Sequence, residues 1–413
     1  MQPNLGHLRT FLAVIDTGSL AGASRQLFRV QSAVTRAIAE LEGSVGAPLF
    51  QRTPAGVVPT PPAEAILPRV RSVMRDLSVW NRRKAAEPLA GDLYRAVPAA
   101  ALNNKRLEIF CRLLRSRHMP TVASQMGVSQ PAVSAAISLL EECAQDKLFL
   151  RTARGLTPTA RAIALGQTTR HALNDLARLA SDIAAAHGTL AGEVVVGALP
   201  LSRASLLPEA IARLVARAHG VQVSTIESPF DDLCAALRAG SLDFIVGALR
   251  EARYSTDLEV HELFAEPLAI IVGAHHPLAA KRRVSLAALA GYQWILPRRD
   301  TPSRALLAAA FELAGQAEPT PAVETGDSMI VRGLLARSTM LAVVSQGQMD
   351  ADLKDGEVKA LPIELAGTVR PIGIIRRAGV LASPPAAALF DTIRDVAREQ
   401  RGGLNAASDA PRE

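Results

Sequence analysis

The chain has 413 residues, a formal net charge of +7 and 49% hydrophobic residues, so it can bury the cores of more than one domain. No apolar run approaches the about 20 residues of a bilayer-spanning helix, and no secretory leader is recognisable, so we expect a cytoplasmic protein. Cys111, Cys143 and Cys234 lie far apart without metal-binding spacing. We therefore expect buried free thiols, and neither a disulfide, a metal nor a cofactor.

The charge is divided unevenly along the chain. Residues 1–190 carry 23 Lys and Arg against 13 Asp and Glu, whereas residues 191–413 carry 23 against 26. A basic N-terminal half suits phosphate binding with release of counterions. Arg outnumbers Lys by 40 to 6 over the whole chain, which weakens this argument because part of the Arg content can follow genome composition.

The basic half is internally repeated. Residues 8–63 match residues 107–162 at a constant offset of 99 positions, without a gap. The identities include Leu8 with Leu107, Phe11 with Phe110, Gln31 with Gln130, Glu42 with Glu141 and Arg52 with Arg151. Apolar residues at helical spacing predict three helices in each copy, and an extended segment with a glycine follows the third. Each copy is therefore interpreted as a helix-turn-helix followed by a wing.

The third helix of each copy is the predicted DNA-reading element. In the first copy Val34, Ile38 and Leu41 face inward, which leaves polar side chains outward at the N-terminal end that enters the major groove. In the second copy Ser129 is placed to cap this helix and Pro131 to occupy its first turn. The first copy has a valine instead of that serine. The side chains expected to contact bases or the nearby backbone are Gln31, Ser32, Thr35, Arg36, Ser129, Gln130, Pro131 and Ser134.

The wings carry arginines that we expect to contact phosphates or the minor groove, namely Arg52, Arg151 and Arg154. The alternative is that each block is a small helical module for protein binding or oligomerisation. A helical block with exposed polar residues is compatible with either use. The pairing of a polar recognition helix with a basic wing, present twice, favours DNA binding.

Each block runs into a further amphipathic helix. In the first, Ile66, Val70, Val73, Leu77 and Trp80 follow spacings of four and three, with Pro68 expected to kink the first turn. The second extends from about 159 to 186 with Leu173, Leu176, Ala180 and Ile183 on one side, before a break at 187–188. Such a stripe can pair between subunits or pack within its own chain. Both readings stay open for the first helix, and for the second we predict subunit dimerisation.

From residue 192 the pattern changes to short Val- and Ile-rich segments that alternate with amphipathic helices such as 206–218. The predicted strands are 194–196, 221–226, 244–246, 268–272, 294–296, 341–344 and 372–375. This alternation predicts an α/β domain with largely parallel sheets. About 200 residues would allow two lobes.

Several of these segments resemble one protein family. G-S-L-A-G-A-S-R-Q-L at 18–27, A-P-L-F-Q-R-T at 47–53, V-S-Q-P-A-V-S at 128–134 and K-L-F-L-R-T at 147–152 are similar to the DNA-binding domain of LysR-type transcriptional regulators. The segments G-E-V-V-V-G at 192–197, L-L-P-E-A-I-A-R-L at 206–214, L-R-A-G-S-L-D-F-I-V-G at 237–247 and H-P-L at 276–278 resemble the effector-binding domain of the same family.

The resemblance implies an α/β multidomain chain with two mainly α winged helix-turn-helix domains and a two-lobed, periplasmic-binding-protein-like (type II) effector domain. The expected divisions are 1–63 and 105–162 for the winged domains, 64–104 for the first linker helix and connector, 163–190 for the linker and dimerisation helix, 191–400 for the effector domain and 401–413 for a disordered tail. Lobe I is expected over about 191–265 and 346–400, and lobe II over about 266–345. The family pattern has one winged domain, so the second one is a departure.

The resemblance also implies partners and a ligand cleft. The partners are promoter DNA, a small-molecule and anionic inducer, further copies of the chain in a dimer or tetramer, and RNA polymerase, in the bacterial nucleoid. The residues expected in the interlobe cleft are Pro200, Leu201, Ser202, Arg203, Gly247, Ala248, Arg298, Thr301, Ser303, Thr325 and Ser345. Arg203 and Arg298 would suit a carboxylate or phosphate, or would be solvated surface charges. Ser202 is the preferred ligand group, because the family binds its ligand beside that strand end.

Two other classes of protein are less compatible with the sequence. A solute-binding transport protein would need an export signal and no winged domains. A cleft enzyme would need a catalytic motif, and the sequence contains no G-x-S-x-G, H-E-x-x-H or P-loop. The adjacent His275 and His276 would point to opposite faces of an extended segment, so we expect exposed turn residues instead of a metal site. We therefore predict a ligand-controlled transcription regulator that is not an enzyme.

Overall fold

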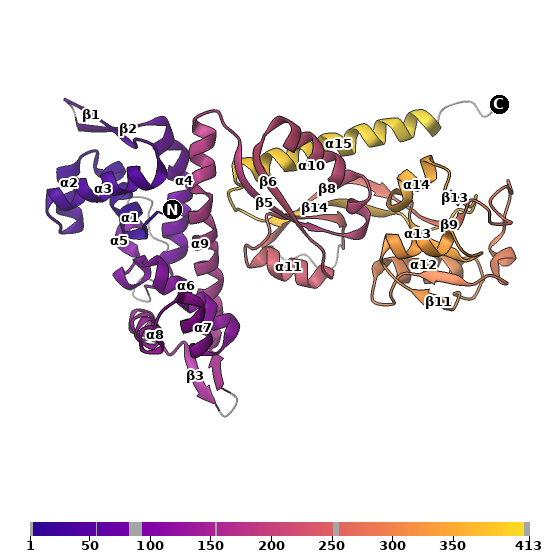
Figure 1. Cartoon of the computed structure of the whole chain (residues 1–413), viewed down its shortest axis with the longest axis horizontal. Coiled ribbons are helices and arrows are strands. Elements are labelled where there is room, and N and C mark those ends of the chain that lie inside the picture. The colour runs from indigo at the N-terminus through magenta and orange to yellow at the C-terminus, as the bar shows by residue number, and fades with distance from the viewer. Residues whose placement is uncertain (1–2, 55, 82–92, 153–154, 251–255, 409–413) are drawn as a thin grey trace. The chain divides into compact units, whose positions relative to one another are not determined.

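The computed structural model describes residues 3–54, 56–81, 93–152, 155–250 and 256–408. The chain divides into two compact units. The first comprises residues 1–192 with 238–241, and the second comprises residues 193–237 and 242–413. Each unit is considered by itself below (Figure 1).

The first unit contains the same series of elements twice. The first copy consists of α1 (Leu5–Thr17), α2 (Leu20–Leu27), α3 (Gln31–Val45), the strands β1 (Phe50–Thr53) and β2 (Gly56–Pro59), and α4 (Pro61–Ser78). The second consists of α6 (Asn104–Ser116), α7 (Met119–Met126), α8 (Gln130–Ala144), β3 (Phe149–Thr152), β4 (Gly155–Pro158) and α9 (Ala160–Ala186). The short helix α5 (Leu93–Ala96) precedes the second copy. The predicted duplication of a helix-turn-helix with a two-stranded wing is confirmed.

The helix ends follow the predicted capping chemistry. The Ser129 side chain accepts a hydrogen bond from the Ala132 N–H at the start of α8, whereas Val30 provides no side-chain cap for α3. Thr60 and Thr159, which are equivalent in the two copies, cap α4 and α9. Pro68 lies inside α4, and the helix continues past it to Ser78.

The helices α4 and α9 lie side by side in the first unit (Figure 1). They are antiparallel, because Arg69 on α4 contacts Asp182 on α9, whereas Trp80 just beyond α4 contacts the earlier Thr169. The apolar residues of both helices belong to one core shared with the two helix-turn-helix blocks. Of the stripe predicted on α9, Leu176 and Ile183 are buried in this intrachain core, Leu173 is half-buried and Ala180 is exposed. The prediction that α9 also pairs between subunits stays a prediction.

The second unit contains two five-stranded sheets. One has the strand order β6-β5-β7-β14-β8. Its strands are β5 (Ala191–Ala198), β6 (Gly220–Ile226), β7 (Phe244–Ala248), β8 (Leu258–Glu266) and β14 (Arg370–Arg377). The other has the order β11-β10-β12-β9-β13. Its strands are β9 (Leu268–Gly273), β10 (Trp294–Leu296), β11 (Pro321–Glu324), β12 (Leu341–Ser345) and β13 (Val358–Ala360).

The helices of this unit are α10 (Leu206–Arg217), α11 (Phe230–Arg238), α12 (Pro302–Leu313), α13 (Ser328–Leu335), α14 (Asp350–Lys354) and α15 (Pro384–Ser408). The α/β class is confirmed and all seven predicted strands are present. The sheets are mixed instead of largely parallel, since β14 runs antiparallel to β7 and β8, and β9 antiparallel to β12 and β13. The strands β8, β11 and β13 were not predicted.

Two expected boundaries change. The strand β13 pairs with β9 in the second sheet, so the chain re-enters the first sheet at β14 instead of near residue 346. The tail was expected to be disordered from residue 401, but α15 extends to Ser408, and residues 409–413 lie outside the described part. Over the residues that the structure describes, no helix combines the length and the apolar character needed to cross a membrane.

Candidate DNA-reading surfaces and effector pocket

The first recognition helix, α3, presents the predicted polar end to solvent. Gln31, Ser32 and Arg36 are exposed. Thr35 is half-buried, and its hydroxyl donates to the Gln31 carbonyl. Arg36 is not free in this structure, because its Nε lies 2.7 Å from Glu40 Oε1. The hydrogen bond that Arg36 donates to Glu40 raises the pKa of Arg36, and any contact between Arg36 and a phosphate has to replace this ion pair.

The second recognition helix, α8, has the same geometry and a different set of side chains. Gln130, Pro131 and Ser134 are exposed, as is the capping Ser129. Ala135 occupies the position of Arg36 and is also exposed. The two helices therefore share a glutamine at the first position but differ in charge one turn later.

The two wings hold their arginines at equivalent positions. Arg52 on β1 is opposite Val57, and Arg151 on β3 is opposite Leu156; both arginines are exposed. Arg154, predicted for the second wing, lies outside the described residues. Exposed cations on a hairpin beside a recognition helix can contact the phosphates that flank a groove.

A carboxylate ties each wing to its recognition helix. Glu42 near the end of α3 accepts hydrogen bonds from the backbone N–H groups of Leu49 at 2.7 Å and Phe50 at 3.2 Å. Glu141 on α8 accepts in the same way from Leu148 at 2.9 Å. The sequence interpretation gave these glutamates no role, although their identity in both copies was the available signal.

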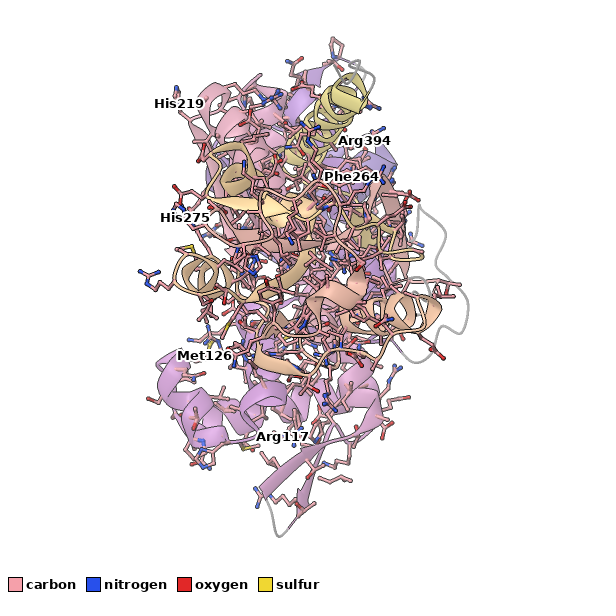
Figure 2. The ribbon with its side chains drawn as sticks, turned by 90° about the vertical axis from the view of Figure 1, so that its right-hand side faces the viewer. Arg117, Met126, His219, Phe264, His275 and Arg394 are labelled. Carbon is pink, nitrogen blue, oxygen red and sulfur yellow. The ribbon has the colours of Figure 1, made fainter. Side chains whose placement is uncertain are left out.

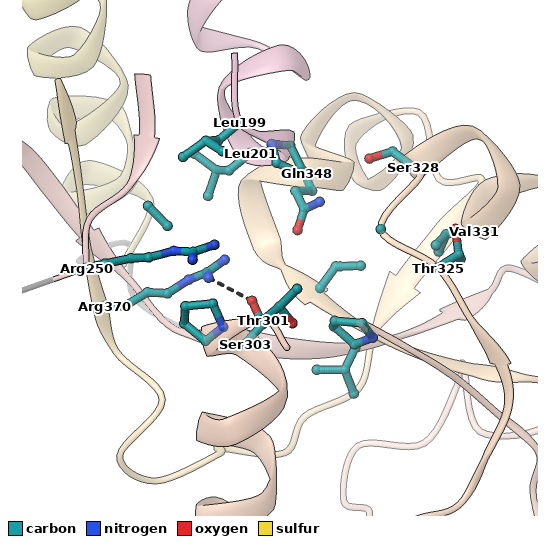
Figure 3. Close-up of a pocket in the computed structure, with 17 residues that line it drawn as sticks. Leu199, Leu201, Arg250, Thr301, Ser303, Thr325, Ser328, Val331, Gln348 and Arg370 are labelled. Carbon is teal, nitrogen blue, oxygen red and sulfur yellow. Dashed lines mark hydrogen bonds between the residues drawn. The ribbon is translucent and has the colours of Figure 1, made fainter. Parts of the chain in front are cut away.

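In the second unit, a pocket with a volume of about 110 Å³ is lined by residues from both sheets and their connections (Figure 3). Its lining consists of Leu199, Pro200, Leu201, Ala248, Arg250, Pro297, Thr301, Pro302, Ser303, Thr325, Gly326, Ser328, Val331, Val343, Val344, Gln348 and Arg370. Six of the residues predicted for the cleft are among them, namely Pro200, Leu201, Ala248, Thr301, Ser303 and Thr325.

Two arginines, Arg250 and Arg370, give the pocket its charge, and both were missed in the sequence. They run side by side into the pocket in Figure 3. Arg370 donates from Nη1 to Ser303 Oγ at 2.7 Å and from Nη2 to Ser345 Oγ at 2.5 Å. Burial lowers the pKa of Arg370, Glu266 opposes this effect, and Arg250 adds to it. The Nε of Arg370 is buried without a hydrogen-bond partner.

The other predicted cleft residues do not line this pocket. Arg203 and Arg298 are exposed, consistent with solvated surface charges. Ser202 is fully buried and its hydroxyl donates to the Leu199 carbonyl at 2.9 Å, so the preference for it as a ligand group is not supported. Ser345 is also fully buried, and it orients Arg370 as described above.

Gly247 supports the pocket instead of lining it. It lies on β7 with a φ of 148°, and a Cβ placed there would lie 2.4 Å from the Leu199 Cβ. The absence of a side chain thus lets the loop that carries Leu199 approach β7 closely.

The histidines and cysteines show no reactive arrangement in the described part of the chain. His275 is exposed, as predicted (Figure 2). His276 was also expected to be exposed, but it is buried, and its Nε2 lies 3.2 Å from the Thr339 carbonyl oxygen. Cys234 is buried, and Cys111 and Cys143 are half-buried. Burial raises the pKa of the Cys111 thiol to about 12, which keeps it protonated and unreactive.

Comparison with known proteins agrees with this architecture. The model of the bacterial regulatory helix-turn-helix domain of the lysR family matches residues 5–64 and again 104–163, and the LysR substrate binding domain matches residues 187–398. The HTH-type transcriptional regulator GalR of Pseudomonas putida strain KT2440 is 44% identical over 398 residues, which cover 96% of this chain and 98% of that protein. The chain therefore belongs to the LysR family of bacterial transcriptional regulators.

Other relatives match a shorter part of the chain. The HTH-type transcriptional regulator PcaQ of Agrobacterium fabrum is 29% identical, and the match covers 95% of that protein but 71% of this chain. The solved structure of full-length CbnR with its target DNA has a TM-score of 0.50 at 21% identity and covers 99% of that chain and 71% of this one. This likeness shows the fold. The chain is thus a LysR-type DNA-binding regulator with an effector-binding domain, and 29% of it lies outside each of these two alignments.

Proposed function

We propose that both winged domains bind promoter DNA and that a small anion in the interlobe pocket controls this binding. The observation that carries the DNA-binding part is the repeated pairing of an exposed polar helix end with an arginine-bearing wing. In this proposal Gln31, Arg36, Gln130 and Ser134 contact base edges or the adjacent backbone. Arg52 and Arg151 neutralise phosphates.

Two guanidinium groups in one small pocket support the anionic effector. Arg250 and Arg370 line the same pocket. The Nε–H group of Arg370 is buried and donates no hydrogen bond within the protein. A carboxylate or a phosphate would satisfy this donor and offset the repulsion between the two cations. A volume of about 110 Å³ restricts the effector to a small molecule.

Further features of the proposal rest on family membership. The protein acts in the bacterial cytoplasm, as a regulator without an enzymatic step, and it assembles through its effector domains and contacts RNA polymerase at the promoter. Closure of the two lobes on the effector would favour one arrangement of the assembly, and DNA binding would change by the difference in effector affinity between the arrangements.

The test is footprinting on the region upstream of the protein's own gene across a salt series, with the double variants Gln31→Ala/Arg36→Ala and Gln130→Ala/Ser134→Ala. We expect salt-dependent protection by the wild type, and each double variant should lose part of it. The absence of any salt-dependent protection by the wild type would contradict the proposal. If only one double variant loses protection, the other winged domain is an assembly module.

A further inference from the structure

The two halves of the first unit are joined in a way that resembles a dimer within one chain. The elements α1 to α4 and α6 to α9 are equivalent at an offset of 99 residues, and α4 pairs with α9 in antiparallel fashion. The starts of the equivalent helices α1 and α6 also meet. Asn104 accepts from the Leu5 N–H at 3.2 Å through Oδ1 and donates to the Pro3 carbonyl at 2.9 Å through Nδ2. Leu5 and Asn104 are equivalent positions, so this contact has the form expected at a twofold axis.

The pairing of α4 with α9 carries a buried ion-pair cluster formed by Arg69, Asp175 and Asp182. Arg69 is fully buried, with Nε 2.5 Å from Asp182 Oδ2, Nη2 3.0 Å from Asp182 Oδ1 and Nη1 3.1 Å from Asp175 Oδ1. The side chains of the two aspartates are 5% and 8% exposed. Burial disfavours the charge of Arg69, but the two carboxylates outweigh it and raise its pKa.

A second contact secures the far end of the pair. The Trp80 indole is fully buried, donates to Thr169 Oγ1 at 3.1 Å and packs edge-on against Phe110 of the second copy, with ring centroids 5.1 Å apart. Nearby, Arg161 at the start of α9 donates to the Val79 carbonyl at 3.0 Å. The first copy thus supplies the buried arginine and tryptophan, and the second copy supplies their acceptors.

This division of roles discriminates against pairs of α9 helices. The α9 position equivalent to Arg69 is Thr168, so two α9 helices from different chains would bury Asp175 and Asp182 beside Arg178 of their own helix but without Arg69. A buried charge that lacks its partner is costly, so the cluster favours the pairing of α9 with α4.

We infer that one chain is a self-contained pair of unlike DNA-reading heads, which binds an operator of two non-identical half-sites. The first head consists of α3 with its wing and the second of α8 with its wing. A helix of 27 residues such as α9 spans about 40 Å, similar to the about 34 Å between major grooves on one face of DNA. Because the heads are covalently joined, binding of one raises the effective concentration of the other. The recognition residues differ, so the half-sites should not be palindromic.

This inference rests on the proposed DNA binding, and its test separates the two. Hydroxyl-radical footprints of the full-length chain are compared for the double variants Gln31→Ala/Arg36→Ala and Gln130→Ala/Ser134→Ala. We expect each variant to lose one half-site while the other is retained with affinity reduced about 10-fold or more. If heads of the same kind paired between chains, each variant would instead lose two symmetric half-sites, which would overturn the inference. If the wild type protects no DNA, the proposed function itself fails.

The cluster has its own test, with a variant designed to remain folded. The triple variant Arg69→Met/Asp175→Leu/Asp182→Leu replaces the charges by apolar side chains, a change that buried ion pairs often tolerate. We expect it to keep the helical content of the wild type. It should lose the preference of α9 for α4 of its own chain, so that additional, larger assemblies appear in sedimentation analysis. The matched control Lys354→Met, which removes an exposed ion pair in the second unit, should not change the assembly. A triple variant with unchanged assembly and unchanged footprints would show that the cluster does not select the unlike pair.

Discussion

Arg69 is the residue on which the pairing within the first unit depends most. Removal of one partner from a buried ion pair leaves the other charge without compensation, which typically costs about 3–5 kcal/mol. We therefore expect Arg69→Met to lower the free energy of unfolding of the first unit by an amount of that order, because Asp175 and Asp182 stay behind. Urea denaturation followed by circular dichroism measures this change. A loss no greater than that of the exposed-pair control Lys354→Met would contradict the structural role of Arg69.

Arg370 is one of the two arginines that give the pocket its charge, and its side chain is held in place by two serine hydroxyls. We expect acetate, succinate or inorganic phosphate to raise the thermal unfolding midpoint of the wild type, since a ligand that binds the folded state stabilises it. The variant Arg370→Met should lose this shift, because the guanidinium with the unused donor is gone. Arg298→Met is the matched control, since Arg298 is exposed and lies outside the pocket lining. Equal shifts in both variants would place the anion elsewhere.

At the scale of elements, the two recognition helices differ by one cap. Val30 and Ser129 have nearly the same extended backbone, with φ and ψ of −66° and 146° against −74° and 153°. Val30→Ser should therefore provide the missing acceptor and stabilise the first copy by about 0.5–1 kcal/mol. Ser129→Ala should destabilise the second copy by about 1 kcal/mol. Both changes are measurable as shifts of the denaturation midpoint, and a destabilising Val30→Ser would show that the valine side chain has another role there.

We expect the wing arginines to contribute to the affinity for DNA of any sequence and not to the choice of sequence. Arg52→Ala and Arg151→Ala each remove one exposed cation from a hairpin. We expect each to weaken binding to all DNA sequences alike and to reduce the slope of log K against log salt by about 1. Fluorescence anisotropy across a salt series on specific and non-specific DNA tests this. A change confined to the specific sequence would mean that the wing reads bases.

The winged domains could be predicted well because their signals are local. Helical spacing around Val34, Ile38 and Leu41 and the cap at Ser129 depend on neighbours within a few residues. The partner of an apolar stripe is not a local property, and for this reason the packing of α9 on α4 within the chain was not predicted. The same holds for the pocket: β14 brings Arg370 to Ser303 from 67 positions away, whereas the predicted Arg298, near in sequence to other lining residues, faces solvent.

At the scale of the molecule, we propose that each chain joins one effector domain to two unlike DNA-reading heads. Relatives such as PcaQ cover 71% of this chain, whereas the 44% identical GalR covers 96% of it, so the alignment with GalR includes both winged domains. In this architecture the pairing that joins two heads is present within each chain, and assembly of further chains is left to other surfaces. The number of DNA half-sites per chain should therefore be two, whatever the oligomeric state.

That ratio is the most direct test of the account. Native mass spectrometry of the full-length protein on a DNA fragment trimmed to two adjacent half-sites from the footprint gives the number of chains bound. We predict one chain for each pair of half-sites. A complex that always contains two chains on two half-sites would contradict the account, because each chain would then be using one head.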